Sequence, residues 1–173
     1  MINLKAYHFI SNYKKGEINN LDKKINIIYR NYNSTIKETD IKNIRNECKK
    51  SGKKFYVSNN FKLAKKLKLD GVYVPSFNKT LNLKFNNKKN FDIIGSAHNL
   101  KEIRIKELQN IQEIFLSPLF KEKINKQLNI YRYLKLRAIT RMKDISLGGI
   151  NSKNLKKLNL IRPVGFAGIS YFE

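Results

Sequence analysis

The chain of 173 residues has little cysteine, tryptophan, proline or acidic side chain, and each shortage narrows what the protein can be. Its single cysteine, Cys48, excludes a disulfide framework, and its place among apolar positions at helical spacing predicts a packing role. No apolar run reaches the roughly 20 residues that a membrane-spanning helix needs. Lys5 and polar neighbours interrupt the first apolar run, so we expect no signal peptide. These absences predict a cytoplasmic protein without a membrane partner.

Acidic residues are scarce beside basic ones: 13 Asp and Glu face 36 Lys and Arg, which gives a net charge of +23. Such an excess raises nucleic acid as a partner. However, the lysines are spread over almost every segment, and the sequence has no zinc-ligand spacing, basic heptad repeat or aromatic–glycine RNA motif. We therefore do not expect nucleic acid as the partner. Attraction of an anionic small molecule is the simpler use of the charge.

The sequence does contain a series of short apolar runs that alternate with segments of helical period, such as the one marked by Ile41, Ile44 and Cys48. Strands that alternate with helices favour a parallel sheet. Eight such strands favour an α/β fold of the (β/α)8 TIM-barrel type, with a doubly wound open sheet as the alternative. The predicted strands are Leu4–Ile10, Ile25–Tyr29, Phe55–Val57, Val72–Val74, Phe91–Ile94, Ile114–Leu116, Ile145–Leu147 and Val164–Ile169.

The length requires a compact version of this fold. Barrels of this kind have about 250 residues, so residues 1–173 form one small domain with shortened connections. Ser11–Lys24 and Ser76–Asn90 are too polar to predict full helices. Asn59, Asn99 and Asn151 each follow a predicted strand and are expected to cap the next helix.

The end of the sequence predicts that the last helix of the barrel is lacking, because Glu173 follows the eighth strand closely. Val164, Phe166 and Ile169 cannot all point into the barrel. Without a covering helix, we expect an exposed apolar stripe beside the first and last strands. Such stripes mark interfaces, so we expect self-association into a homo-oligomer through this face.

Two glycine-bearing strand ends, Ile145–Ile150 and Gly165–Ser170, are the most informative local features. In (β/α)8 barrels the loops after strands 7 and 8 commonly bind phosphate. Glycine lets backbone N–H groups approach phosphate oxygens without a Cβ in the way. The pair therefore predicts a phosphorylated small-molecule ligand.

Further strand ends carry motifs in a fixed order. Leu69–Pro75 reads Leu-Asp-Gly-Val-Tyr-Val-Pro, Gly95–Asn99 reads Gly-Ser-Ala-His-Asn, Ser117–Phe120 reads Ser-Pro-Leu-Phe, and Arg30 follows the second strand. Together with the glycine segments, these motifs resemble the thiamine phosphate synthase/TenI family, whose members are (β/α)8 barrels of thiamine metabolism. The resemblance extends over nearly the whole chain.

The resemblance also shows where this chain departs from the family. A synthase of the family joins a pyrimidine diphosphate to a thiazole phosphate and holds Mg²⁺ with two aspartates. The matching positions are Asn59 and Asn78, degenerate metal positions with neutral amides, whereas Mg²⁺ prefers carboxylate oxygens. The strand-2 Gln and Lys of the family are replaced by Ile28 and Tyr32. We therefore expect no metal and no cofactor, with Mg²⁺ needed only if the protein is a true synthase.

The resemblance implies that the thiazole-phosphate half of the site is better retained. Its backbone donors and its loop lysine have counterparts at plausible positions here. The implied substrate-binding residues are Arg30, Ser96, Lys126, Gly148, Gly149, Ile169 and Ser170.

The combination resembles the TenI branch, whose activity is the tautomerisation of a thiazole carboxylate phosphate. That branch uses a histidine base, which matches His98 here. A histidine pKa near 6.5 allows the side chain to take and return a proton near neutrality. His98 is thus the expected catalytic residue, the alternative being a structural role at the strand end. Three functions remain open: a TenI-like enzyme, a true thiamine phosphate synthase, and a non-catalytic barrel that binds a phosphate ligand.

Overall fold

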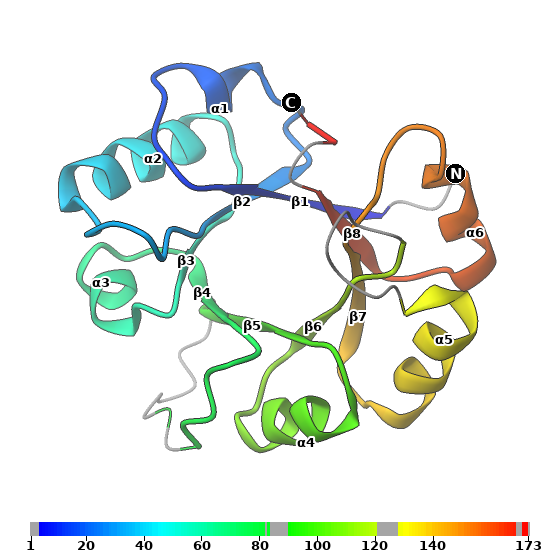
Figure 1. The fold of residues 1–173 in the computed structure, drawn as a ribbon. Helices are drawn as coiled ribbons and strands as arrows, with labels where there is room; N and C mark the ends of the chain where they lie inside the picture. The colour runs from blue at the N-terminus through cyan, green and yellow to red at the C-terminus, as the bar shows by residue number, and fades with distance from the viewer. Residues whose placement is uncertain (1–3, 82, 84–89, 121–127, 169–170, 173) are drawn as a thin grey trace.

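The computed structural model describes residues 4–81, 83, 90–120, 128–168 and 171–172. Eight parallel strands close into a barrel, in which each strand pairs with the next and β8 pairs with β1 (Figure 1). This confirms the predicted (β/α)8 barrel over the open sheet. The strands are β1 (Lys5–Ile10), β2 (Ile25–Tyr29), β3 (Phe55–Ser58), β4 (Gly71–Val74), β5 (Asp92–Ala97), β6 (Glu113–Leu116), β7 (Lys143–Leu147) and β8 (Gly165–Gly168).

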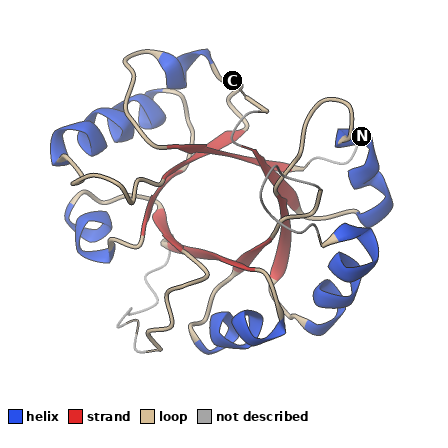
Figure 2. Cartoon of the chain, in the orientation of Figure 1, coloured by secondary structure: helices blue, strands red, loops and turns tan. Residues whose placement is uncertain are grey.

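The helices surround the ring of strands (Figure 2). They are α1 (Glu17–Asn20), α2 (Glu38–Lys50), α3 (Phe61–Lys66), α4 (Leu100–Leu108), α5 (Asn129–Ile139), the 3₁₀ turn η1 (Leu155–Lys157) and α6 (Leu158–Ile161). As the polar composition predicts, the Ser11–Lys24 segment holds only the four residues of α1. In the described part of the chain, no helix lies between β4 and β5 or follows β8. None of the helices described is long and apolar enough to cross a membrane.

The alternation of each strand divides the buried side chains into two layers. One layer fills the barrel interior and is rich in aromatic rings: Tyr7, Phe9, Tyr56, Tyr73 and Phe115 are all buried there. Their rings meet edge to face, as between Tyr7 and Phe115 at 5.1 Å, which is a favoured arrangement of aromatic pairs. The interior is therefore a packed core, and a ligand must bind at one of its ends.

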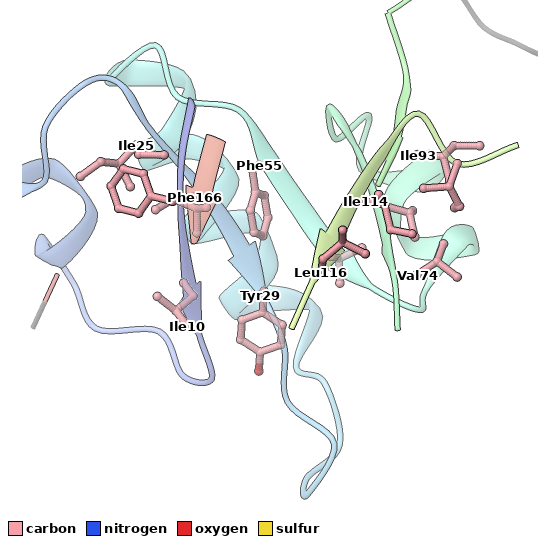
Figure 3. Packing of buried hydrophobic residues seen from close by; sticks show 14 of the residues in the cluster. Ile10, Ile25, Tyr29, Phe55, Val74, Ile93, Ile114, Leu116 and Phe166 are labelled. Carbon is pink, nitrogen blue, oxygen red and sulfur yellow. The ribbon is translucent and has the colours of Figure 1, made fainter. Parts of the chain in front are cut away.

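The second layer lies between the strands and the helices (Figure 3). It contains the outward residues of the strands, including Ile25, Phe55, Val74 and Ile114, and the inward residues of the helices. The helical positions predicted from periodicity on α2 belong to this layer, because Ile41, Ile44 and Cys48 are buried. Burial raises the pKa of the Cys48 thiol to about 12, which makes it an inert packing residue, as expected.

One of the predicted helix caps is confirmed and another is wrong. The Asn99 side chain accepts a hydrogen bond from the backbone N–H of Glu102 and caps α4. At α3 the cap is Asn60, whose side chain accepts from the N–H of Leu63 at 3.0 Å. Asn59 has a left-handed backbone, with φ of 55°, and its side chain accepts a hydrogen bond from Asn78. The third, Asn151, bonds backbone N–H groups in the turn before η1.

The expected exposed stripe beside β8 and β1 is not found at Phe166, which is only 8% exposed. The C-terminal residues Tyr171 and Phe172 cover it, with ring centroids at 5.4 and 5.9 Å from that of Phe166. Ile18 of α1 is buried in the same layer. The prediction was wrong because two aromatic residues near the C-terminus cover Phe166 in place of a helix. Ile169 lies outside the described residues.

Candidate functional site

The predicted site residues gather at the carboxyl ends of the strands. Arg30 directly follows β2, Asn59 follows β3, His98 follows β5 and Gly148 follows β7. Since all eight strands are parallel in a closed barrel, these positions surround one mouth. Active sites of barrel enzymes are built at this end.

The opposite end contains a hollow of about 850 Å³ that is lined by strand-starting residues such as Lys5, Asp92 and Lys143. Its charges are largely used within the protein. Lys5 pairs with Glu113, and Lys54 pairs with Asp92 at 2.7 Å. This end therefore forms the floor of the barrel, opposite the end at which active sites of this fold lie.

His98 lies at the mouth with a side chain that is 46% exposed, so that a substrate can reach it. Its Nδ1 lies 2.9 Å from Glu102 Oε2, and the same carboxylate oxygen accepts the His98 backbone N–H at 2.7 Å. A carboxylate only accepts, so in the neutral imidazole it is Nδ1 that carries the proton and Nε2 that has the lone pair. The imidazole is thus held in the tautomer that a general base requires.

Glu102, which contacts the predicted site residue His98, is a residue that the sequence analysis missed. Its second oxygen accepts from Asn99 Nδ2 at 3.0 Å, while Asn99 Oδ1 accepts the Glu102 backbone N–H at 3.0 Å. This reciprocal pair is a variant of the capping box, in which the third helical residue reaches back to the cap. The signal in the sequence was the Asn-x-x-Glu spacing directly after His98.

Arg30 and Ser96 meet around the phenol of Tyr73, which is buried in the barrel interior. Burial raises the pKa of Tyr73 to about 12, against a smaller opposing effect of its hydrogen bonds with Ser96 and Arg30. The Arg30 guanidinium also lies over the Phe9 ring, 4.6 Å from its centroid. Ser96 is buried and hydrogen-bonds to Tyr73. Arg30 is half-buried and lines a pocket of about 310 Å³ between the loops after β1 and β2.

Asn59 and Asn78, the predicted degenerate metal positions, lie in contact. Asn78 Nδ2 donates to Asn59 Oδ1 at 2.6 Å, and Asn78 Oδ1 accepts the backbone N–H of Thr80 at 2.9 Å. Both amide oxygens are therefore already hydrogen-bonded. Mg²⁺ prefers several carboxylate or water oxygens in octahedral geometry, so this donor set does not fit the ion.

Lys106 and Gln109, at the C-terminal end of α4, hold the loop that carries Asn78. Lys106 is fully buried, and its Nζ donates to the carbonyls of Pro75 and Asn78 at 2.8 Å each and to Gln109 Oε1 at 2.9 Å. Gln109 Nε2 donates to the carbonyls of Asn78 and Thr80. Burial lowers the pKa of Lys106 to about 8. We call Lys106 and Gln109 the α4 clamp. The sequence did not predict it, because nothing in the sequence distinguishes Lys106 from the many exposed lysines.

Gly148 and Gly149 both have positive φ, at 96° and 64°. A residue with a side chain rarely adopts this conformation. Asn154 Nδ2 donates to the Gly149 carbonyl at 2.7 Å and fixes the loop. The remaining predicted phosphate ligands, Lys126, Ile169 and Ser170, lie outside the described residues.

A family model described as thiamine monophosphate synthase matches residues 22–172 of the chain. The comparison of this chain with curated proteins found no match. Among solved structures, thiamine phosphate pyrophosphorylase from Pyrococcus furiosus is similar at 16% identity and a TM-score of 0.76, over 98% of this chain and 87% of that one.

Thiamine phosphate pyrophosphorylase from Bacteroides thetaiotaomicron is similar at 14% identity and a TM-score of 0.58, over 96% of this chain and 83% of that one. FabK from Thermotoga maritima is similar at 12% identity and a TM-score of 0.71, over 99% of this chain and 60% of that one. At these identities, the structural likeness supports the fold alone.

Proposed function

Because the chain belongs to the thiamine monophosphate synthase/TenI family, we propose that it catalyses a metal-independent proton transfer on a thiazole phosphate, with His98 as the base. The reaction class is a tautomerisation, as in the TenI branch. One observation carries the choice of a metal-independent reaction: the Asn78 amide donates to the Asn59 amide at 2.6 Å, where a synthase needs two metal-binding carboxylates.

The proton transfer uses the free Nε2 of His98. This atom removes a proton from a ring carbon of the substrate, and the imidazolium returns a proton at a second position, so that substrate and product are isomers. The Glu102 carboxylate stabilises the charge that forms on the ring during the step. General acid–base catalysis of this kind contributes roughly 10²- to 10⁴-fold in rate.

The phosphate of the substrate is held on the other side of the mouth. Gly148 and Gly149 permit close approach to the backbone through their positive φ. Arg30 adds a permanent positive charge. The net charge of +23 attracts anionic ligands over a longer range.

A second candidate function, thiamine phosphate synthesis from a pyrimidine diphosphate and a thiazole phosphate, is favoured by the description of the matching family model. Loss of pyrophosphate builds up negative charge, which needs cations for its stabilisation. The neutral pair Asn59 and Asn78 does not supply them, which ranks this candidate second.

The test measures both reactions in Mg²⁺ and in EDTA. We expect isomerisation of thiazole carboxylate phosphate under both conditions, and no condensation with the pyrimidine diphosphate. Synthase turnover that requires Mg²⁺ would reverse the ranking. The double variant Asn59→Asp, Asn78→Asp is the matched control, because two carboxylates should create Mg²⁺ affinity that the natural chain lacks.

A further inference from the structure

Two aromatic rings, Tyr32 and Phe77, stand exposed at the mouth of the barrel. Their exposed fractions are 52% and 59%, although their ring centroids lie only 5.4 Å apart at an interplanar angle of 74°. Tyr32 belongs to the loop after β2 and Phe77 to the loop after β4, on either side of β3. The rings therefore form an open corner beside the Asn59–Asn78 pair, whose two members follow β3 and β4.

Both sides of this corner are held in place. Tyr32 Oη is hydrogen-bonded to Oγ of the buried Ser58, at 2.8 Å. Phe77 lies between Pro75 and Asn78, whose carbonyls both accept from Lys106 Nζ at 2.8 Å. A ligand that contacts these rings does not have to order them first, which lowers the entropic cost of binding.

The four side chains of the corner are themselves neutral, and Arg30 is a charged neighbour that acts on Tyr32. Burial raises the pKa of Tyr32, so its phenol stays protonated at neutral pH. The amides of Asn59 and Asn78 carry no charge either. A single guanidinium offsets only part of the charge of a diphosphate, whereas two rings inclined at 74° offer one face for stacking and one edge for a T-shaped contact.

We infer that Tyr32 and Phe77 form a stacking subsite for an uncharged planar heterocycle, beside the phosphate-binding half of the mouth. The inference rests on the proposed function and names the ligand chemistry of the same site. The heterocycle has two possible sources: the thiazole ring of the phosphorylated substrate, or a separate aminopyrimidine without its diphosphate.

Calorimetry with three probes distinguishes these sources: thiazole phosphate, an uncharged aminopyrimidine, and inorganic phosphate as the ringless control. We expect Tyr32→Ala and Phe77→Ala each to lower the affinity of the protein for one of the two heterocycles about tenfold. A loss of this size is in the range of aromatic stacking on a planar base. Inorganic phosphate should bind with unchanged affinity. The matched control is Tyr131→Ala, because Tyr131 is a 67% exposed ring on α5.

The variant Tyr32→Phe separates stacking from hydrogen bonding, since it keeps the ring and removes the bond to Ser58. We expect it to retain most of the affinity that Tyr32→Ala loses. Unchanged affinity of both alanine variants for both heterocycles, with circular dichroism like that of the natural chain, overturns the inference.

The outcome for the proposed function is read separately. If isomerisation proceeds and depends on His98 while the alanine variants bind normally, the stacking subsite is wrong and the function stands. If isomerisation is absent but an aminopyrimidine binds through Tyr32 and Phe77, the function is wrong and the subsite stands.

Discussion

Glu102 has two roles at the first turn of α4, because one carboxylate completes the cap with Asn99 and holds the His98 ring. A residue that stabilises a helix end and, in the proposed function, orients the base is under two physical constraints. Replacing it therefore separates chemistry from folding only if the substitution keeps the shape of the side chain.

Glu102→Gln is such a substitution. We expect turnover to fall about tenfold to a hundredfold, because the amide no longer stabilises the imidazolium, while substrate affinity changes little. The measurement is kcat and KM for isomerisation across pH 5–9. Glu107→Gln on the same helix is the control, since Glu107 pairs with Arg104 away from the mouth. Equal kcat in both variants would remove Glu102 from the mechanism.

Gly149 permits a second prediction at a single position. Gly149→Val should lower affinity for thiazole phosphate at least tenfold, or about 1.4 kcal/mol, because a Cβ blocks the approach to the backbone. Gly52→Val controls for backbone strain: Gly52 has a φ of 68°, similar to the 64° of Gly149, and open space around it. Calorimetry should show lost affinity only at Gly149; an equal loss in both variants contradicts a phosphate role for this loop.

At the scale of elements, α4 connects the floor of the site to the helix layer. The α4 clamp holds the backbone of the loop after β4 through four hydrogen bonds of 2.8 to 3.1 Å. A further hydrogen bond, of 2.9 Å, joins Lys106 to Gln109. That loop contributes Asn78 and Phe77 to the mouth. The geometry of the stacking subsite and of the Asn59–Asn78 pair therefore depends on a lysine buried among carbonyls.

The buried state of Lys106 makes stability depend on pH in a defined window. Its pKa in the folded chain is about 8, below the ordinary 10.5. Between these values the unfolded chain binds more protons, so this group makes the free energy of unfolding rise as the pH rises from 8 to 10.5. Urea unfolding at pH 7.5, 8.5 and 9.5 should show this rise in the natural chain and not in Lys106→Met.

The control for that series is Lys101→Met, because Lys101 is an exposed lysine on the same helix. It should retain the pH dependence of the natural chain. Parallel curves for the natural chain and Lys106→Met would show that Lys106 titrates as an exposed lysine does.

The elements differ in how far the sequence predicts them. The strands follow from short apolar runs, and the mouth follows from barrel closure, which brings Arg30, Asn59 and His98 to one end whatever the loops do. The α4 clamp does not follow, because burial of Lys106 depends on carbonyls 28 and 31 residues away in the chain. Periodicity detects apolar positions alone, and a lysine that ends in a polar pocket inside the fold is invisible to it.

At the scale of the whole molecule, a short segment covers the barrel after β8, where the described residues include no helix. The segment after β8 places Tyr171 and Phe172 over Phe166, and Phe172 also lies 5.3 Å from the ring of His8 on β1. In Figure 1 the C-terminal end accordingly lies beside β1 and α1. The sequence predicted bare strands here, because two aromatic residues after a strand carry no helical period.

Phe172→Ala tests this closure. It should expose Phe166, lower the free energy of unfolding by roughly 1–3 kcal/mol, and create the apolar stripe that the sequence predicted. Sedimentation equilibrium should then show more self-association in the variant than in the natural chain. Tyr131→Ala, which removes an exposed ring from α5, is the control. Identical stability and association in both variants would mean that Phe172 covers nothing of consequence.

The proposed proton transfer by His98 without metal is tested most directly by following thiazole carboxylate phosphate by NMR in D₂O with excess EDTA. We predict that the natural chain isomerises the substrate and incorporates deuterium at the exchanged carbon, and that His98→Ala loses this activity about 10²- to 10⁴-fold. Deuterium incorporation that is equal in His98→Ala, or turnover that appears only when Mg²⁺ and a pyrimidine diphosphate are added, would contradict it.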